Sequence, residues 1–214
     1  MSIRDIITNI HPPIELARRL GPQGIRMILE IMWIAYHDLV EERVVNIGFD
    51  ENDITQEWFL RIQSRWDPGC LVSRLCPIPQ YGDSTLAAKR GQKPTIDFCF
   101  RTWNIRDEYF GAECKILKAG DQTKVDRYIN TGINNFTTGR YGSKCSTSAM
   151  VGYVLQGPIG SVISKLGQSV ALLNPAGSLS RDMTWDDPHY HSRHLRTFDD
   201  TNILLHHMFF LFEE

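Results

Sequence analysis

Charged side chains interrupt two neighbouring hydrophobic segments, residues 94–100 and 109–117. Asp97 lies in the first segment, and Glu113 and Lys115 lie in the second. Because side chains alternate across a strand, Glu113 and Lys115 should point to the same face. If the two segments pair as a hairpin, two carboxylates and an ammonium converge in an apolar stretch. Burying such charges is costly unless a metal or a partner compensates, so the pattern predicts a functional site.

A simpler interpretation is an exposed hairpin that carries a surface Glu-Lys pair, since Glu-x-Lys is common in proteins. The surroundings favour a functional site instead. The chain offers two strand-like segments with acids on matching faces, and a helix-like segment follows them.

The periodicity of apolar residues predicts the elements that position these side chains. Helices are expected over 12–21 and 24–43, from Asp53 as an N-cap, over 122–137 after Asp121, and from about 159 to 173. Strands are expected over 70–78, 94–103, 108–118, 149–156, 189–196 and 203–212, with a loop over 81–93. This order predicts an α/β fold with a mixed central sheet flanked by helices.

The chain resembles the PD-(D/E)XK nuclease superfamily over about residues 50–156. Asp97 matches the acid that the family carries on its second core strand, and Glu113-Cys114-Lys115 matches its (D/E)-x-K. The proline of the signature is displaced, because Pro94 lies three residues before Asp97. The resemblance implies one domain over 1–214 with a restriction-endonuclease-like core. Added N-terminal helices would occupy about 1–49, and an extension with C-terminal strands about 157–214.

The resemblance also implies a metal-dependent nuclease. Asp97, Glu113 and the backbone carbonyl of Cys114 would hold Mg²⁺ or Mn²⁺, which prefer hard oxygen ligands. Lys115 would stand beside the attacking water, and the Cys114 thiol would point into the core. DNA is the expected substrate, and prokaryotic restriction or anti-phage defence is the role that the family suggests.

Two further groups of residues follow from the resemblance. The family often adds a glutamate on its first core helix, for which Glu51 is the candidate, while Glu57 and the Glu41-Glu42 pair are rivals. Phosphate contacts are expected from cations around the motif. These are Lys118, Lys124, Arg127, Arg140 and Lys144, together with Lys89, Arg90 and Lys93 in the preceding loop.

The composition of the chain limits how it could bind nucleic acid and other partners. The formal net charge is −2 and the pI is about 6.4, so binding of nucleic acid would need a local basic patch or an oligomer. The lack of a separate DNA-recognition domain suggests structural specificity, a partner protein that supplies targeting, or a homodimer. The five cysteines include no CxxC, and no signal-peptide core follows the N-terminus, so a cytoplasmic protein without membrane segments is expected.

Other motifs support different functions. His189, His191, His194 and the His206-His207 pair suggest zinc, although ordinary strand histidines explain them as well. The segment 157–161 joins a strand to a helix start, as anion sites do, but a structural turn is the simpler interpretation. A catalytically inactive module that binds nucleic acid or protein is the main alternative function. An unrelated α/β protein, with Asp97 far from Glu113, is the third.

Overall fold

The computed structural model describes residues 21–46, 48–66, 75–83, 93–102, 108–173 and 178–212. Within these ranges the strands are β1 (Leu75–Gly82), β2 (Thr95–Thr102), β3 (Phe110–Lys118), β4 (Thr147–Gln156), β5 (Ser180–Arg181), β6 (His189–Leu195) and β7 (Asn202–Leu211). The helices are α3 (Gly21–Glu41), α4 (Glu51–Arg65), α5 (Gln122–Arg127), the π-helical η2 (Tyr128–Ile133), α6 (Asn134–Thr137) and α7 (Ile159–Leu173).

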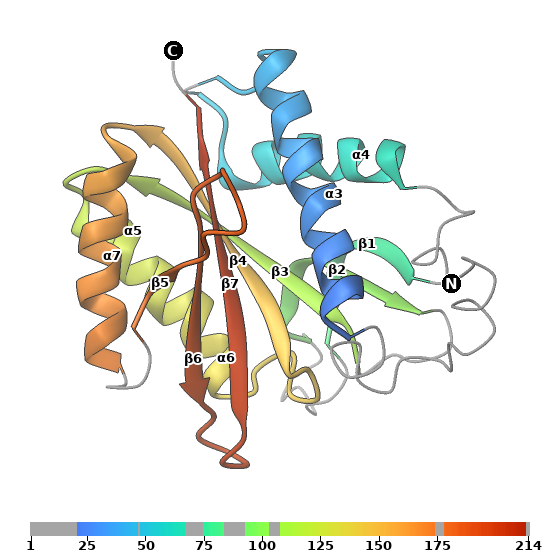
Figure 1. The fold of residues 1–214 in the computed structure, drawn as a ribbon, viewed down its shortest axis with the longest axis vertical. Coiled ribbons are helices and arrows are strands. Elements are labelled where there is room, and N and C mark those ends of the chain that lie inside the picture. Colours follow the sequence, from blue (N-terminus) through green and yellow to red (C-terminus); the bar gives the residue numbers. More distant parts are fainter. Residues whose placement is uncertain are drawn as a thin grey trace.

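The described strands form one seven-stranded sheet in the order β1-β2-β3-β4-β7-β6-β5. The pairs β3–β4 and β4–β7 are parallel, and the other neighbours are antiparallel, so the sheet is mixed. The segment α5–η2–α6 connects β3 to the parallel strand β4 (Figure 1). The expected α/β class with a mixed, helix-flanked sheet is therefore confirmed, and the C-terminal strands extend the sheet beyond β4.

Helices cover both faces of the sheet (Figure 1), and a hydrophobic core lies beneath them on each face. On one face α3 and α4 pack around Trp58, whose indole N–H donates to the Met32 carbonyl oxygen at 3.0 Å. On the other face α5, η2, α6 and α7 pack over side chains that include Leu117 and Met150. Residues 112 and 114 contribute to the first core, as their shared parity on β3 requires.

The expected elements are mostly present, with three differences. Helix α4 begins earlier than expected, because Asp50 is the N-cap and Asp53 completes a capping box with it. Strand β1 continues to Gly82, into the segment expected to be a loop. The helix expected over 122–137 begins after the predicted N-cap Asp121 but changes to π-helical geometry over η2.

The helix expected over 12–21 and the first residues of the strand expected over 70–78 lie outside the described residues, apart from Gly21, which belongs to α3. Among the helices that the structure describes, none combines the length and the apolar character needed to cross a membrane.

Candidate active site

Asp97, Glu113 and Lys115 lie together where β2 meets β3. The Lys115 Nζ donates to Glu113 Oε1 at 2.7 Å and to the Cys114 carbonyl oxygen at 2.7 Å. Glu113 and Lys115 are each only 6% exposed. The interpretation as a surface Glu-Lys pair is therefore wrong, and the Cys114 side chain is buried in the core as expected.

The divergence of β2 from β3 creates the space for the site. The two strands pair from Phe100↔Phe110 to Phe98↔Ala112, and the pairing stops there. Beyond that point Asp97 Oδ2 accepts the backbone N–H of Cys114 at 2.6 Å. A side-chain carboxylate thus takes the place of a ladder partner, so the Cys114 N–H of β3 stays satisfied where the pairing with β2 has ended.

Glu51 completes the group from the first turn of α4. Its Oε2 accepts the Ile116 N–H at 3.0 Å, and its Oε1 accepts from Lys115 Nζ at 3.2 Å. The N-cap at Asp50 fixes where α4 starts and therefore where Glu51 points. The structure thus brings the favoured helix glutamate to the site.

The rival glutamates belong to a different ion-pair cluster. The Arg61 guanidinium donates to Glu57 at 2.7 Å and also to Glu42. Glu41 is exposed at the end of α3. Of the glutamates considered for the helix position, Glu51 is the one that contacts Lys115.

Burial and mutual repulsion shape the protonation of the site. Burial, reinforced by the nearby Asp97 carboxylate, raises the pKa of Glu113 to about 7 despite the opposing effect of Lys115. Burial also raises the pKa of Asp97, although Lys115 and the Cys114 N–H oppose the increase. For Lys115, burial lowers the pKa, but Glu113, Asp97 and Glu51 outweigh it and raise the pKa above its ordinary value. Lys115 therefore keeps its proton, and Glu113 is the group poised near neutrality.

The donor set fits a hard divalent cation in its chemistry. Three carboxylates surround one buried ammonium, and the buried Oε2 of Glu113 has no hydrogen-bond partner. Within the described part of the chain, no three His, Cys, Asp or Glu residues already form a metal-binding cluster. The Lys115 ammonium bonds to both Glu113 and the Cys114 carbonyl oxygen, two of the expected ligands. Cation binding would require Lys115 to leave that carbonyl.

Tyr141 and the loop before β4 close one side of the site. The Tyr141 hydroxyl interacts with Glu113 and lowers its pKa slightly, without aligned hydrogen-bond geometry to Oε2. The loop is anchored by Asp83, whose Oδ2 accepts the Tyr109 hydroxyl at 2.6 Å and the Gly142 N–H at 2.8 Å. Gly142 has a φ of 66°, which favours glycine there. The sequence did not single out these residues, because their proximity depends on the tertiary fold.

The cations expected to contact phosphates differ in their exposure and in their position relative to the site. Arg127 lies at the site, with Nη2 3.9 Å from Glu51 Oε1 and half of its side chain exposed. Lys118 and Arg140 are exposed and Lys124 is half-buried. Lys144 lines a separate hollow of about 550 Å³.

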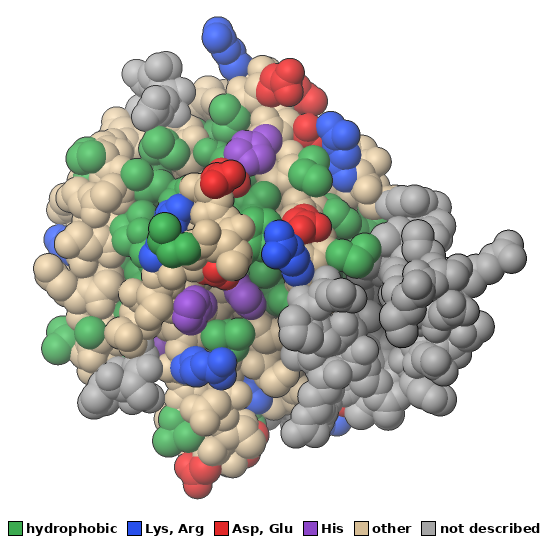
Figure 2. Space-filling view, viewed as in Figure 1, with side chains coloured by type: hydrophobic (Ala, Val, Ile, Leu, Met, Phe, Trp, Pro, Cys, Tyr) green, Lys and Arg blue, Asp and Glu red, His purple; other side chains and the backbone are tan. Residues whose placement is uncertain are grey.

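Lys93 is exposed, whereas Lys89 and Arg90 lie outside the described residues. On the face seen in Figure 2, described acidic and basic side chains are interspersed without an extended field of one sign. This distribution agrees with the slightly negative net charge of the chain.

The C-terminal histidines form a buried hydrogen-bond network. Trp33 Nε1 donates to His189 Nδ1 at 3.2 Å, and His189 Nε2 lies 3.0 Å from His206 Nδ1. Ser192 Oγ lies 2.7 Å from both His194 Nε2 and His207 Nε2. These nitrogens are occupied by protein partners, so the interpretation as strand histidines satisfied in the core is confirmed.

The turn before α7 has a structural explanation. Gly157 has a φ of 85°, and a Cβ atom there would lie 2.4 Å from Ala119 Cβ. Glycine is therefore needed for backbone geometry and close packing, as the structural-turn interpretation holds.

Comparisons with known proteins identify no relative. No protein-family model, no curated protein and no solved structure matches the chain.

Proposed function

We propose that this protein is a metal-dependent nuclease with a PD-(D/E)XK-type site on a restriction-endonuclease-like core, and that it hydrolyses phosphodiester bonds in DNA. One observation carries the proposal. Lys115 Nζ lies within 3.2 Å of carboxylates from both α4 and β3, and Asp97 bonds to the residue between Glu113 and Lys115. Asp97, Glu113 and Lys115 match the family signature, and Glu51 takes the position of the glutamate that the family often adds.

The proposed roles follow from the charges. Asp97, Glu113 and the Cys114 carbonyl oxygen would hold Mg²⁺ or Mn²⁺, with Glu51 at its edge. A bound cation would polarise a phosphoryl oxygen and lower the pKa of a water. Lys115, which keeps its proton, would neutralise charge that develops at the phosphate. Arg127, half-exposed beside Glu51, is suited to contact the phosphate backbone.

A non-catalytic role has one observation in its favour. Lys115 already neutralises Glu113 and Glu51, and a buried ion pair of this kind can be purely structural. In that case the same fold would bind nucleic acid or protein without cleaving it. The two functions differ in whether a divalent cation enters the carboxylate group.

The test compares cleavage by matched variants. Wild-type protein, Glu113→Gln, Lys115→Met and Glu57→Gln are incubated with plasmid and single-stranded DNA in Mg²⁺, Mn²⁺ or EDTA. Glu57→Gln is the control, since Glu57 contacts Arg61 rather than Lys115. The proposal expects metal-dependent cleavage by the wild type and the control, and none by the two site variants.

The other outcomes are informative. Cleavage that survives in Glu113→Gln and Lys115→Met would place the activity outside this site. Metal-independent binding of DNA by all four proteins, without cleavage, would favour the binding module.

A further inference from the structure

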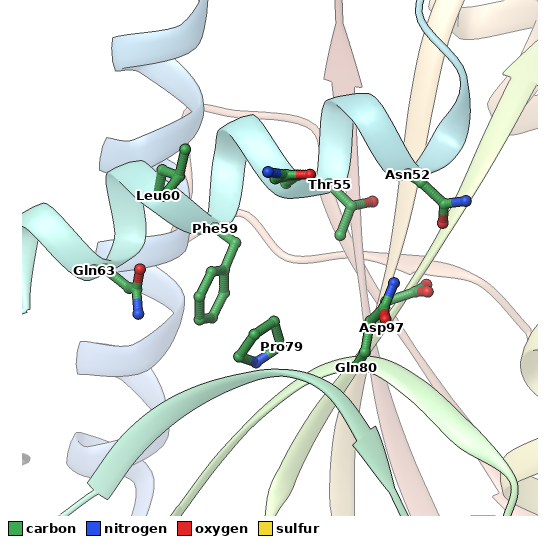
Figure 3. Close-up of a pocket in the computed structure, with 9 residues that line it drawn as sticks. Asn52, Thr55, Phe59, Leu60, Gln63, Pro79, Gln80 and Asp97 are labelled. Carbon is green, nitrogen blue, oxygen red and sulfur yellow. The ribbon is translucent and has the colours of Figure 1, made fainter.

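A groove next to Asp97 runs between α4 and strands β1 and β2. It has a volume of about 660 Å³, within the range of small-molecule sites. In Figure 3 α4 forms one wall, and Pro79, Gln80 and Asp97 lie on the opposite side. Because Asp97 belongs to both, the groove opens directly onto the proposed active site.

Side-chain amides dominate the polar lining of the groove. Asn52, Gln56 and Gln63 lie on one stripe of α4, at spacings that place them on the same helix face. Gln80 faces them from β1. All four side chains are exposed, and none of them hydrogen-bonds to another residue within the described part of the chain. The stripe from 52 to 63 is about 16 Å long, at 1.5 Å per residue.

The rest of the lining is apolar and lacks positive charge. Phe59, Leu60 and Pro79 provide flat or aliphatic surfaces, and no described Lys or Arg lines the groove. A phosphate would therefore find no counter-charge here, and the Asp97 carboxylate would repel it. A neutral, planar group with hydrogen-bonding edges suits these walls much better.

Gln80 adds a backbone observation. Its φ is 44°, a left-handed conformation that is uncommon outside glycine. The neighbouring residues pair regularly, as Pro79↔Phe98 and Tyr81↔Ile96, which places Gln80 opposite Asp97. Strain at one residue between regular pairs is typical of functional sites.

We propose that this groove binds unpaired nucleobases of the substrate strand next to the scissile phosphate, with a preference for adenine. The amide group presents a donor and an acceptor side by side, which matches the adenine edge. Phosphates would be left to cations outside the groove, such as Arg127. The inference rests on the proposed function in one respect, because it takes the substrate to be nucleic acid.

The experiment measures binding without metal, so that it does not depend on cleavage. Fluorescence anisotropy in EDTA compares single-stranded homoadenine, homothymine and abasic oligonucleotides of equal length. The double variant Gln56→Leu with Gln63→Leu removes two of the four amides at similar volume and helix propensity. Gln168→Leu, at an exposed position on α7, is the matched control, and circular dichroism checks that each variant is folded.

We expect the wild type and Gln168→Leu to bind homoadenine at least about tenfold more tightly than the abasic strand. In the double variant this ratio should fall clearly below the wild-type value, while abasic binding stays unchanged. A wild type that binds abasic and base-containing strands equally would overturn the inference, as would a ratio that persists in the double variant.

The same measurements separate this inference from the nuclease proposal. Base-dependent binding that weakens in the double variant, in a protein that cleaves nothing, would keep the groove and reject the nuclease. Metal-dependent cleavage accompanied by binding without any base dependence would keep the nuclease and reject the groove.

Discussion

Acidification from pH 7.5 to 5.5 should weaken the fold through the buried histidines of β6 and β7. His189, His194 and His207 are 0%, 2% and 0% exposed. Burial lowers the pKa of His189 to about 3 and that of His194 to about 4, and it holds the pKa of His207 well below its ordinary value. In the unfolded chain a histidine titrates near 6.5.

The sign of the effect follows from proton binding. Between the folded and unfolded pKa values the unfolded chain binds more protons, so stability is complete above about pH 6.5 and falls as the pH drops. Each of these three histidines should cost about 1.3 kcal/mol at pH 5.5 relative to pH 7.5. His206, whose pKa burial lowers to about 4, should cost a similar amount, so the four together should cost about 5 kcal/mol. These values depend on the unfolded pKa, because the folded pKa values lie far below 5.5.

Glu113 acts in the opposite direction. Its pKa is raised to about 7 in the folded protein from a usual value of 4.5. The folded state therefore binds more protons between these values, and the fold gains about 2 kcal/mol over the same acidification. The wild type should thus lose only about 3 kcal/mol, and Glu113→Gln should lose about 5 kcal/mol.

Urea unfolding at both pH values tests this account. His194→Gln should remove about 1.3 kcal/mol of the acid-dependent loss. Arg193→Gln, at an exposed position on the same strand, should match the wild type. The reasoning is refuted if wild type, His194→Gln and Glu113→Gln all lose the same stability.

Three further outcomes are expected. Lys115→Met should reduce cleavage at least about 100-fold, while DNA binding measured by anisotropy should change little. The control Lys165→Met on α7 should cleave normally. Wild-type cleavage by Lys115→Met would contradict the proposed role. Asp97→Asn should weaken Mg²⁺ binding in calorimetry at least about tenfold, whereas Asp121→Asn, which preserves the cap of α5, should not; equal affinities would exclude Asp97 as a ligand. Trp58→Ala should cost about 3–5 kcal/mol of unfolding free energy in urea, because Trp58 is fully buried. Leu60→Ala, at an exposed position, is the control. A loss under 1 kcal/mol in Trp58→Ala, comparable to that of the control, would show that the core around Trp58 collapses to fill the space.

Local patterns in the sequence determined the strands of the site and the faces of their side chains. The alternation of residues 112–117 predicts that Glu113 and Lys115 share a face while Cys114 enters the core, since a strand has a period of two. The turn chemistry at Asp121 and the apolar stripe of α4 likewise depend on neighbours only a few residues away. Such features need no long-range contact, so they can be derived from the chain alone.

The tertiary structure decided which distant residues meet. Glu51 was one of several candidate glutamates, and only the packing of α4 against the sheet places it beside Lys115 while Glu57 bonds to Arg61. The start of α4 also differed from the expectation. Asp50 and Asp53 form the capping box together, and from the sequence either residue could be the N-cap.

The burial of individual side chains was also decided by the tertiary fold. The sequence does not show whether the histidines of β6 and β7 face solvent or the core. Their pairing with Trp33 and Ser192 depends on contacts across as many as 156 positions. Long-range contacts of this kind set the desolvation that shifts a pKa, so no local pattern can reveal them.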